Sequence, residues 1–211
     1  LSRVYSQKGD AIAEYVRERR IFAPIDEVPE LVKNAFISAE DKNFYSHPGV
    51  DAVGIAKAVT RFAVARASGQ SARLSGASTI TQQVIKNFLV GNERAIERKI
   101  KEIILASRLE ETLDKDLILE LYLNEIFLGQ NSYGVAAAAQ TYFNKSLDEL
   151  APHEAAMLAS LPKAPGEFHP VRGKERLLER RNYVLNEMFQ NGYLSEAAYT
   201  SERAKPLLSV Q

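Results

Sequence analysis

The chain has 211 residues and is 45% hydrophobic, which is enough for one large core or two small lobes. Basic and acidic residues balance at 27 each, so the overall charge does not favour a nucleic-acid partner, and the absence of cysteine excludes a disulfide framework and a thiolate metal site. The histidines, His47, His153 and His169, lack metal-ligand spacing. No apolar run is long enough to span a membrane, and because the chain starts at Leu1 rather than methionine, we expect it to be part of a longer protein whose anchor lies upstream.

Residues 1–28 are mixed in character, and short strands or extended segments are expected there. After Pro29, apolar residues recur at helical spacing up to an acidic pair, Glu40 and Asp41, and the helix is expected to stop at His47-Pro48-Gly49. Glu40 falls on the flank of the apolar arc near the negative helix end, where a carboxylate holds its proton more strongly, as suits a general base. A surface acidic pair beside a turn is the alternative, and the local sequence alone favours it.

Residues 52–92 contain five cations and no acidic residue, although the whole chain is neutral. Within this stretch, residues 52–67 predict a basic amphipathic helix. Such a helix lies on an anionic membrane surface, with about 1 kcal/mol gained per cation near the headgroups. The alternative is an ordinary amphipathic helix that covers a core. Residues 67–72 predict a mobile loop.

The run from Gly76 to Gln83 is rich in hydroxyl and amide side chains and leads into a helix that Ser78 or Thr79 can cap. Its side chains offer many hydrogen bonds to a sugar or a phosphate, and its exposed amides suit an anion. The alternative is simply the polar start of a helix.

Residues 93–111 give the clearest helical pattern. Ile96, Ile100 and Ile103 share one face, and the opposite face carries three cations and one carboxylate: Arg94, Arg98, Lys101 and Glu102. One interpretation of this charged face is that Arg98 and Glu102 form an ion pair that only stabilises the helix, by about 0.3–0.5 kcal/mol. The surplus of cations indicates an anionic ligand instead, with phosphate as the natural candidate.

The rest of the chain predicts more helices and no sustained β alternation. Helices are expected at 115–128, 133–143, 151–160 and 175–190, with a loop at 163–170 and a last short helix capped by Ser195. In the first of these, Leu117, Ile118, Leu121 and Tyr122 are expected in the core, and Gly129 ends the helix. The fold is therefore predicted to be mostly α.

Five ordered motifs over about residues 25–192 resemble those of glycosyltransferase family 51, the peptidoglycan transglycosylase domains of bifunctional penicillin-binding proteins and of monofunctional transglycosylases. They read Glu40-Asp41-x-x-Phe44-x-x-His47-x-Gly49, Gly76-x-Ser-Thr-Ile-Thr-Gln-Gln83, Arg98-Lys-x-x-Glu102, Ile118-Leu-x-x-Tyr-Leu-Asn124 with Phe127-x-Gly129 and Gly134-Val, and Arg180-x-x-x-Val184-Leu185. One departure is His169-Pro170, where the family more often has Asn-Pro.

The resemblance implies a mainly α, lysozyme-like fold with two lobes and a long cleft. It implies a single domain over residues 1–211, in which 50–75 is a mobile, membrane-facing segment of the smaller lobe. The implied activity is polymerisation of lipid II, an undecaprenyl-diphosphate-linked disaccharide-pentapeptide, into β-1,4 glycan strands with inversion. The implied partners are lipid II, the growing lipid-linked chain, the membrane surface and other cell-wall synthesis proteins, at the outer face of the bacterial cytoplasmic membrane.

Carried over by motif, Glu40 is the expected base on the acceptor 4-hydroxyl, and Glu102 is the second essential carboxylate, which assists departure of the diphosphate or holds the basic cluster. Asp41 is expected to orient the first motif rather than do chemistry. The expected substrate-binding residues are Asp41, Phe44, Ser78, Gln82, Gln83, Lys86, Asn87, Arg94, Arg98, Lys101 and Arg180. The sequence requires no cofactor and shows no metal-ligand spacing, while the family resemblance leaves room for a divalent cation, Mg²⁺ or Mn²⁺, at the diphosphate.

Two rival functions remain. A lysozyme-like hydrolase or lytic transglycosylase would need an acid to protonate a sugar leaving group but would not need a cation cluster. A non-enzymatic helical module that binds membranes would explain residues 52–67. It would not explain their combination with Glu40, the polar run at 76–83 and the basic helix face.

Overall fold

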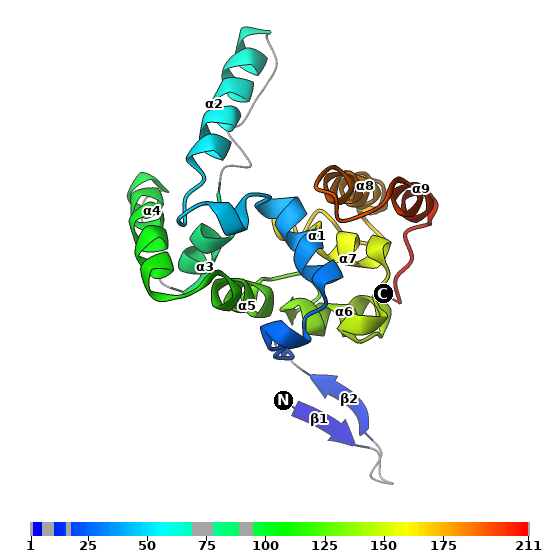
Figure 1. The fold of residues 1–211 in the computed structure, drawn as a ribbon. Helices are drawn as coiled ribbons and strands as arrows, with labels where there is room; N and C mark the ends of the chain where they lie inside the picture. Colours follow the sequence, from blue (N-terminus) through cyan, green and yellow to red (C-terminus); the bar gives the residue numbers. More distant parts are fainter. Residues whose placement is uncertain (1, 6–10, 16–17, 69–77, 89–94, 211) are drawn as a thin grey trace.

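The computed structural model describes residues 2–5, 11–15, 18–68, 78–88 and 95–210, and it is mainly helical, as predicted (Figure 1). The helices are α1 (Glu30–Glu40), α2 (Ala52–Ala67), α3 (Ile80–Phe88), α4 (Ala95–Thr112), α5 (Lys115–Glu125), α6 (Val135–Phe143), α7 (Pro152–Leu158), α8 (Lys174–Gln190) and α9 (Glu196–Ala204). Short 3-10 turns occupy Ile25–Glu27, Phe44–Ser46, Leu147–Glu149 and Leu161–Lys163.

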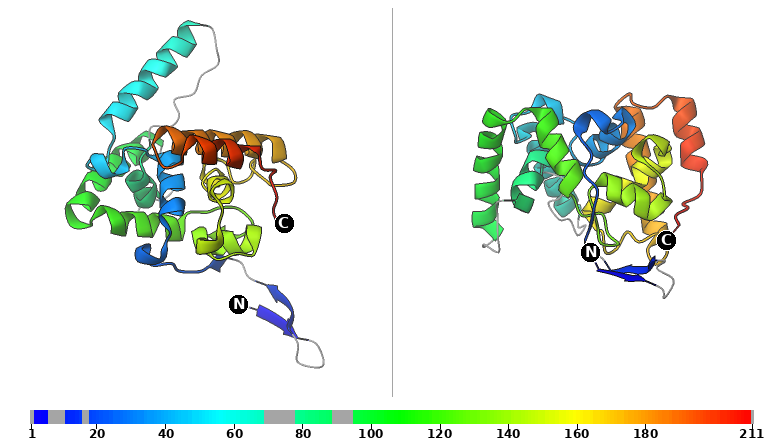
Figure 2. Two further views of the ribbon diagram at one scale, coloured as in Figure 1. Left: turned by 45° about the vertical axis from the view of Figure 1, so that its right-hand side comes forward. Right: turned by 90° about the horizontal axis from the view of Figure 1, so that it is seen from below.

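The strands are short, and the first two lie outside the helical body. Strands β1 (Ser2–Tyr5) and β2 (Ala11–Tyr15) form an antiparallel pair that projects from the body (Figures 1 and 2). Strand β3 (Arg19–Arg20) pairs in parallel with β4 (Ser132–Tyr133), which fixes the entering chain beside α6. The expected short strands before residue 28 are thus present.

One contiguous apolar core joins α1, α3, α5, α6, α7 and α8. Helix α1 packs against α7 and α8, while α3 packs against α4 and α5. The largest fully buried apolar side chains include Phe36 of α1, Ile80 of α3 and Tyr122 of α5. The end of α1 meets α3 through the hydrogen bonds of Asp41 to Ile80 and of Gln83 to Glu40, and these contacts bring the first two sequence motifs together.

Helix α1 ends earlier than the sequence pattern predicts. It stops at Glu40, because Asp41 leaves helical geometry with φ −158° and its carboxylate accepts a hydrogen bond from the backbone N–H of Ile80. The chain then turns to Gly49, whose φ is +85° and where an added Cβ would lie 2.7 Å from the carbonyl oxygen of Ala106. Only glycine suits this position, since it needs a left-handed backbone at close approach to α4.

Helix α2 has the predicted bounds and projects away from the body (Figures 1 and 2). The Asp51 carboxylate caps it by accepting from the N–H of Gly54 at 2.8 Å. None of its described side chains is fully buried, and Val53, Val59 and Val64 are 48–64% exposed. The alternative of a helix that covers a core is therefore wrong, whereas the predicted mobile loop lies mostly outside the described residues.

Two helices differ in detail from the prediction. Helix α5 ends at Glu125 rather than Leu128, because Ile126 is extended and Phe127 forms a bridge with Tyr133. The expectation that Leu117 is a core residue is wrong, since it is 38% exposed at the outer side of the first turn of α5. The predicted apolar face of α4 exists, but Ile100 and Ile103 on it are 54% and 37% exposed.

Candidate active site

A cleft with a volume of about 1310 Å³ lies beside the C-terminal end of α1. Its walls come from the end of α1 and the turn that follows it, most of the length of α2, α3 with the two residues before it, one residue of α4, residues 162–168 in part, and α8. The sequence-predicted residues that line it are Glu40, Asp41, Ser78, Gln82, Gln83, Lys86, Glu102 and Arg180. The structure therefore brings six segments of the chain to one cavity, and the predicted residues come from four of them.

Glu40 is a largely enclosed carboxylate that faces the cleft, with a side chain that is 14% exposed. One carboxylate oxygen accepts from Gln83 Nε2 at 3.0 Å, and the other lies 3.7 Å from Arg180 Nη2. Burial raises the pKa of Glu40 above its ordinary value of 4.5, although the Gln83 bond and the charges of Arg180 and Lys163 oppose the rise. The raised pKa makes Glu40 a stronger base than an ordinary carboxylate, as suits a general base.

Asp41 ties this end of α1 to its surroundings and is nearly buried. Its two oxygens lie 2.9 and 3.0 Å from His47 Nε2, and one of them also accepts from the N–H of Ile80. The carbonyl of His47 in turn accepts from Lys115 Nζ at 2.7 Å, and that ammonium lies 4.5 Å from the centre of the Phe44 ring. His47 and Phe44 thus lie beneath the cleft, where they fix the loop and do not line the cavity.

Glu102 forms the second carboxylate centre and is 5% exposed. It accepts from Lys99 Nζ at 3.1 Å and lies 3.5 Å from Arg98 Nε. Lys99 also donates to Ser78 Oγ at 2.9 Å and to Gln82 Oε1 at 3.2 Å. One ammonium therefore connects the third motif on α4 to the second motif at the start of α3.

The start of α3 bridges the two centres with consecutive residues. Gln82 accepts from Lys99 beside Glu102, while Gln83 donates to Glu40. The backbone N–H of Thr79 donates to Gln82 Oε1, and the backbone N–H of Gln82 donates to Thr79 Oγ1, each at 3.2 Å. This reciprocal pair is typical of a helix cap. The helix cap thus fixes the spacing between the carboxylate that can act as a base and the cation cluster.

Lys99 was not among the predicted binding residues, because a helical wheel places Lys101 rather than Lys99 on the face that carries Arg98 and Glu102. Neither lysine lines the cleft itself, but Lys99 is bonded to cleft residues whereas Lys101 is exposed. The signal for Lys99 was present in the third motif, Arg98-Lys-x-x-Glu102, and in its spacing three residues before Glu102.

The remaining predicted residues are dispersed. Asn87 is exposed and does not line the cleft, Arg98 approaches Glu102 from outside the cavity, and Arg94 lies outside the described residues. The cleft is also lined by side chains that belong to none of the five sequence motifs: Lys57, Lys163, Phe168, Arg176, Glu179, Tyr183 and Glu187. They come from α2, the turn at 161–163, the loop after it and α8.

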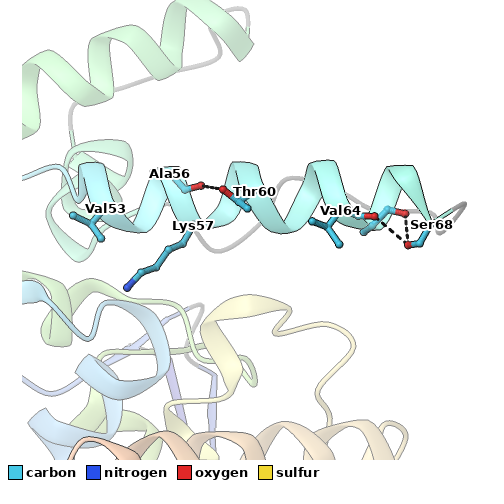
Figure 3. A pocket seen from close by; sticks show the side chains of 7 residues that line it. Val53, Ala56, Lys57, Thr60, Val64 and Ser68 are labelled. Carbon is cyan, nitrogen blue, oxygen red and sulfur yellow. Dashed lines mark hydrogen bonds between the residues drawn. The ribbon is translucent and has the colours of Figure 1, made fainter.

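A second hollow of about 670 Å³ follows one face of α2 (Figure 3). Its lining is mostly apolar and includes Val53, Val64 and Lys57, and Figure 3 shows Lys57 extending from the helix toward the body. Lys57 also lines the main cleft. An apolar path along α2 therefore meets the polar cleft at an ammonium group.

The described residues contain no group of three or more His, Cys, Asp or Glu side chains that could hold a metal ion. Glu102, the carboxylate nearest the cation cluster, is already bonded to Lys99. These donors do not fit a metal ion held by the protein. The arrangement supplies a base at Glu40 and fixed positive charge near Glu102.

Comparisons with known proteins agree on one family. A family model described as Transglycosylase matches residues 8–189. The chain is 50% identical over 208 residues to penicillin-binding protein 1A of Rickettsia conorii and 47% identical over 204 residues to that of Escherichia coli, covering 99% and 97% of this chain. It spans only 26% and 23% of those two proteins. The crystal structure of penicillin-binding protein 1A from Haemophilus influenzae matches with a TM-score of 0.62 and 30% identity, over 99% of this chain and 21% of that one.

Proposed function

The chain belongs to the transglycosylase family, and from this we propose that it is a peptidoglycan glycosyltransferase that polymerises lipid II into β-1,4 glycan strands. The observation that carries the proposal is a single cleft that holds both an enclosed carboxylate of raised pKa, Glu40, and a carboxylate with bound cations, Glu102. The first suits activation of a sugar hydroxyl, and the second suits a leaving group that develops negative charge.

In the proposed reaction, Glu40 takes the proton of the 4-hydroxyl of incoming lipid II. The oxygen then forms a bond to the anomeric carbon of the growing chain as the bond from that carbon to the diphosphate breaks, with inversion. Undecaprenyl diphosphate leaves with the bonding electron pair. A neutral sugar hydroxyl is a weak nucleophile, so a base held within hydrogen-bond reach is required.

The departing diphosphate gains negative charge, which fixed cations stabilise most strongly when they are already in place. Lys99 is held in place by three acceptors, Ser78, Gln82 and Glu102. We assign Glu102 the task of holding Lys99 and Arg98, with Lys86 and Arg94 as further cations and Arg180 beside Glu40. A divalent cation at the diphosphate would arrive with the substrate, and no step is assigned to it.

The two rival functions account for less of the site. A hydrolase of the lysozyme type needs a carboxylic acid beside a neutral sugar leaving group and has no use for Lys99. A membrane-binding module needs no enclosed carboxylate at all, and burying Glu40 without a function is unfavourable.

The test is incubation of the protein with lipid II in detergent. We expect glycan polymer together with one undecaprenyl diphosphate for each new glycosidic bond, measured by chromatography of both products. Absence of polymer from folded protein would contradict the proposal.

We also propose that α2 contacts the membrane at its outer face, where lipid II is supplied, and that other cell-wall synthesis proteins act beside it. Among the described residues, no helix is long and apolar enough to cross a membrane. The exposed valines of α2 and Lys57 combine apolar surface with positive charge, which favours an anionic bilayer.

Replacing Val53, Val59 and Val64 together by glutamine should weaken binding to anionic lipid vesicles on the order of 100-fold, because about 1 kcal/mol of apolar burial is lost at each site. Co-sedimentation measures the loss. The matched control is Val210→Gln, which changes an equally exposed valine at the other end of the chain and should bind vesicles like the unchanged protein. Equal binding by all three proteins would exclude α2 as the contact.

A further inference from the structure

A largely enclosed ion pair lies beneath the cleft and has no part in the reaction described above. Lys115, the first residue of α5, places its ammonium 2.8 and 2.7 Å from the two carboxylate oxygens of Glu110 on α4. The Glu110 side chain is 8% exposed and that of Lys115 is 21% exposed, and neither residue lines the cleft. Neither belongs to the five sequence motifs. The pair therefore needs an explanation other than contact with a substrate.

The stability of α5 does not explain a lysine at its first position. A cation in the first turn faces the positive end of the helix dipole, which is unfavourable. Asp114 already caps the helix, because its carboxylate accepts from the N–H of Leu117 at 2.8 Å. An enclosed ion pair also gains little over apolar side chains of the same size, since both charges lose their water. The charge of Lys115 is thus better explained by what its ammonium holds.

The ammonium of Lys115 joins the ion pair to the loop that follows α1. It donates to the carbonyl oxygen of His47 at 2.7 Å and lies over the buried ring of Phe44. His47 Nε2 in turn lies 3.0 and 2.9 Å from the two oxygens of Asp41, the residue next to Glu40. Two contacts therefore lead from Lys115 to the residue beside the proposed base.

The other half of the ion pair leads to Glu40 from α3. The Thr81 hydroxyl donates to Glu110 Oε1, and Gln83, two residues further along α3, donates to Glu40 Oε2 at 3.0 Å. Thr81 is fully buried, so its contact with Glu110 is shielded from the solvent of the cleft. Side-chain contacts and chain neighbours thus form a closed ring of seven residues: Glu40, Asp41, His47, Lys115, Glu110, Thr81 and Gln83.

We propose that Lys115, with Glu110 as its partner, is a positioning residue that fixes Glu40 against Gln83. The inference rests on the proposed function, because Glu40 is the proposed base. The end of α1 carries Glu40 and α3 carries Gln83, and the ion pair is bonded to both sides from beneath the cleft. A displacement of about 1 Å near a reacting group can lower a rate about 100-fold, so a fixed loop matters for turnover.

The test replaces both members of the pair, in Lys115→Met/Glu110→Gln, so that no enclosed charge is left without its partner. The matched control is Lys145→Met/Glu154→Gln. It removes another ion pair, in which the ammonium lies 2.8 Å from both carboxylate oxygens and neither residue lines the cleft. Each double variant loses one cation and one anion, so the net charge of the protein stays the same.

The first readout is the protonation midpoint of Glu40. In protein labelled with ¹³C at the glutamate carboxyl, the Glu40 signal is the one absent from Glu40→Gln. The charged groups that act on Glu40 are Arg180 of α8, Lys163 of the turn at 161–163 and Asp41, and both double variants keep all of them. The second readout is the pair of constants kcat and KM with lipid II, and the melting temperature reports on the fold.

We expect Lys115→Met/Glu110→Gln to raise the Glu40 midpoint by about half a pH unit, because a displaced Glu40 loses the Gln83 donor that stabilises its ionised form. Its kcat should fall about 10-fold or more, while KM stays within about twofold. The control should leave the midpoint and kcat in place, even where its melting temperature falls. An unchanged midpoint in the first variant, or an equal shift in both, would overturn the inference.

Thr81→Val opens the same ring at a second point and keeps the ion pair, so it decides the question if the first variant does not fold. It should move the Glu40 midpoint in the same direction, and an unchanged midpoint would then refute the role of Lys115. If the unchanged protein does not polymerise lipid II, the proposed function fails, and the NMR midpoint still shows whether the ion pair positions Glu40.

Discussion

Replacing Glu40 by glutamine is expected to reduce polymerisation of lipid II by about 10²–10⁴-fold, the usual contribution of a positioned acid or base. Glutamine keeps the shape of the side chain and can still accept from Gln83, but it cannot take a proton. Binding of lipid II should change little, because the cations of the cleft remain. Steady-state kinetics together with a binding titration separates the two effects.

The same variant should be at least as stable as the unchanged protein at neutral pH. Burial raises the folded-state pKa of Glu40 above 4.5, so the folded state holds the proton more tightly than the unfolded state does. Ionised Glu40 therefore lowers stability as the pH rises from the ordinary carboxyl range through the raised folded value, and glutamine removes that cost.

Glu30→Gln is the matched control for Glu40, since Glu30 lies in the first turn of the same helix and is exposed there beside Lys33. It should retain full polymerisation. Turnover by Glu40→Gln close to that of Glu30→Gln would refute the assignment of the base.

The second large effect is expected at Lys99. Its replacement by alanine removes the ammonium that joins Ser78, Gln82 and Glu102 and leaves the nearly buried Glu102 beside Arg98. Loss of one fixed group that stabilises developing charge typically costs about 10²–10³-fold in rate. Affinity for a diphosphate-bearing lipid should fall far more than affinity for a neutral glycan, as measured by titration calorimetry with each ligand.

Lys101→Ala provides the comparison on the same helix, two residues away and on an exposed side. Its effect on both ligands should be much smaller than that of Lys99→Ala. Equal losses for the charged and neutral ligands in Lys99→Ala would mean that the cluster only supports the fold.

Local pattern was sufficient to predict most of the helices. Asp51 caps α2 and Ser195 caps α9, and both helices begin where the sequence pattern places them. The end of α1 could not be predicted in this way. It depends on Asp41 bonding to the N–H of Ile80, which is 39 residues away and adjacent only after α1 and α3 have packed.

The members of the cation cluster also could not be predicted from local sequence alone. A helical wheel resolves which faces carry charge, but the choice between Lys99 and Lys101 depends on where α3 crosses α4. Only that packing brings Ser78 and Gln82 within reach of Lys99. Of the α8 residues that line the cleft, only Arg180 was predicted from the sequence.

The most direct test of the central claim presents one preparation of the protein with two substrates in parallel, lipid II and preformed glycan strands without a lipid diphosphate. Glycan length is measured before and after incubation by gel electrophoresis. The transferase function predicts that lipid II becomes polymer while the preformed strands keep their length. Shortened strands without any polymer from lipid II would contradict it and would favour a hydrolase.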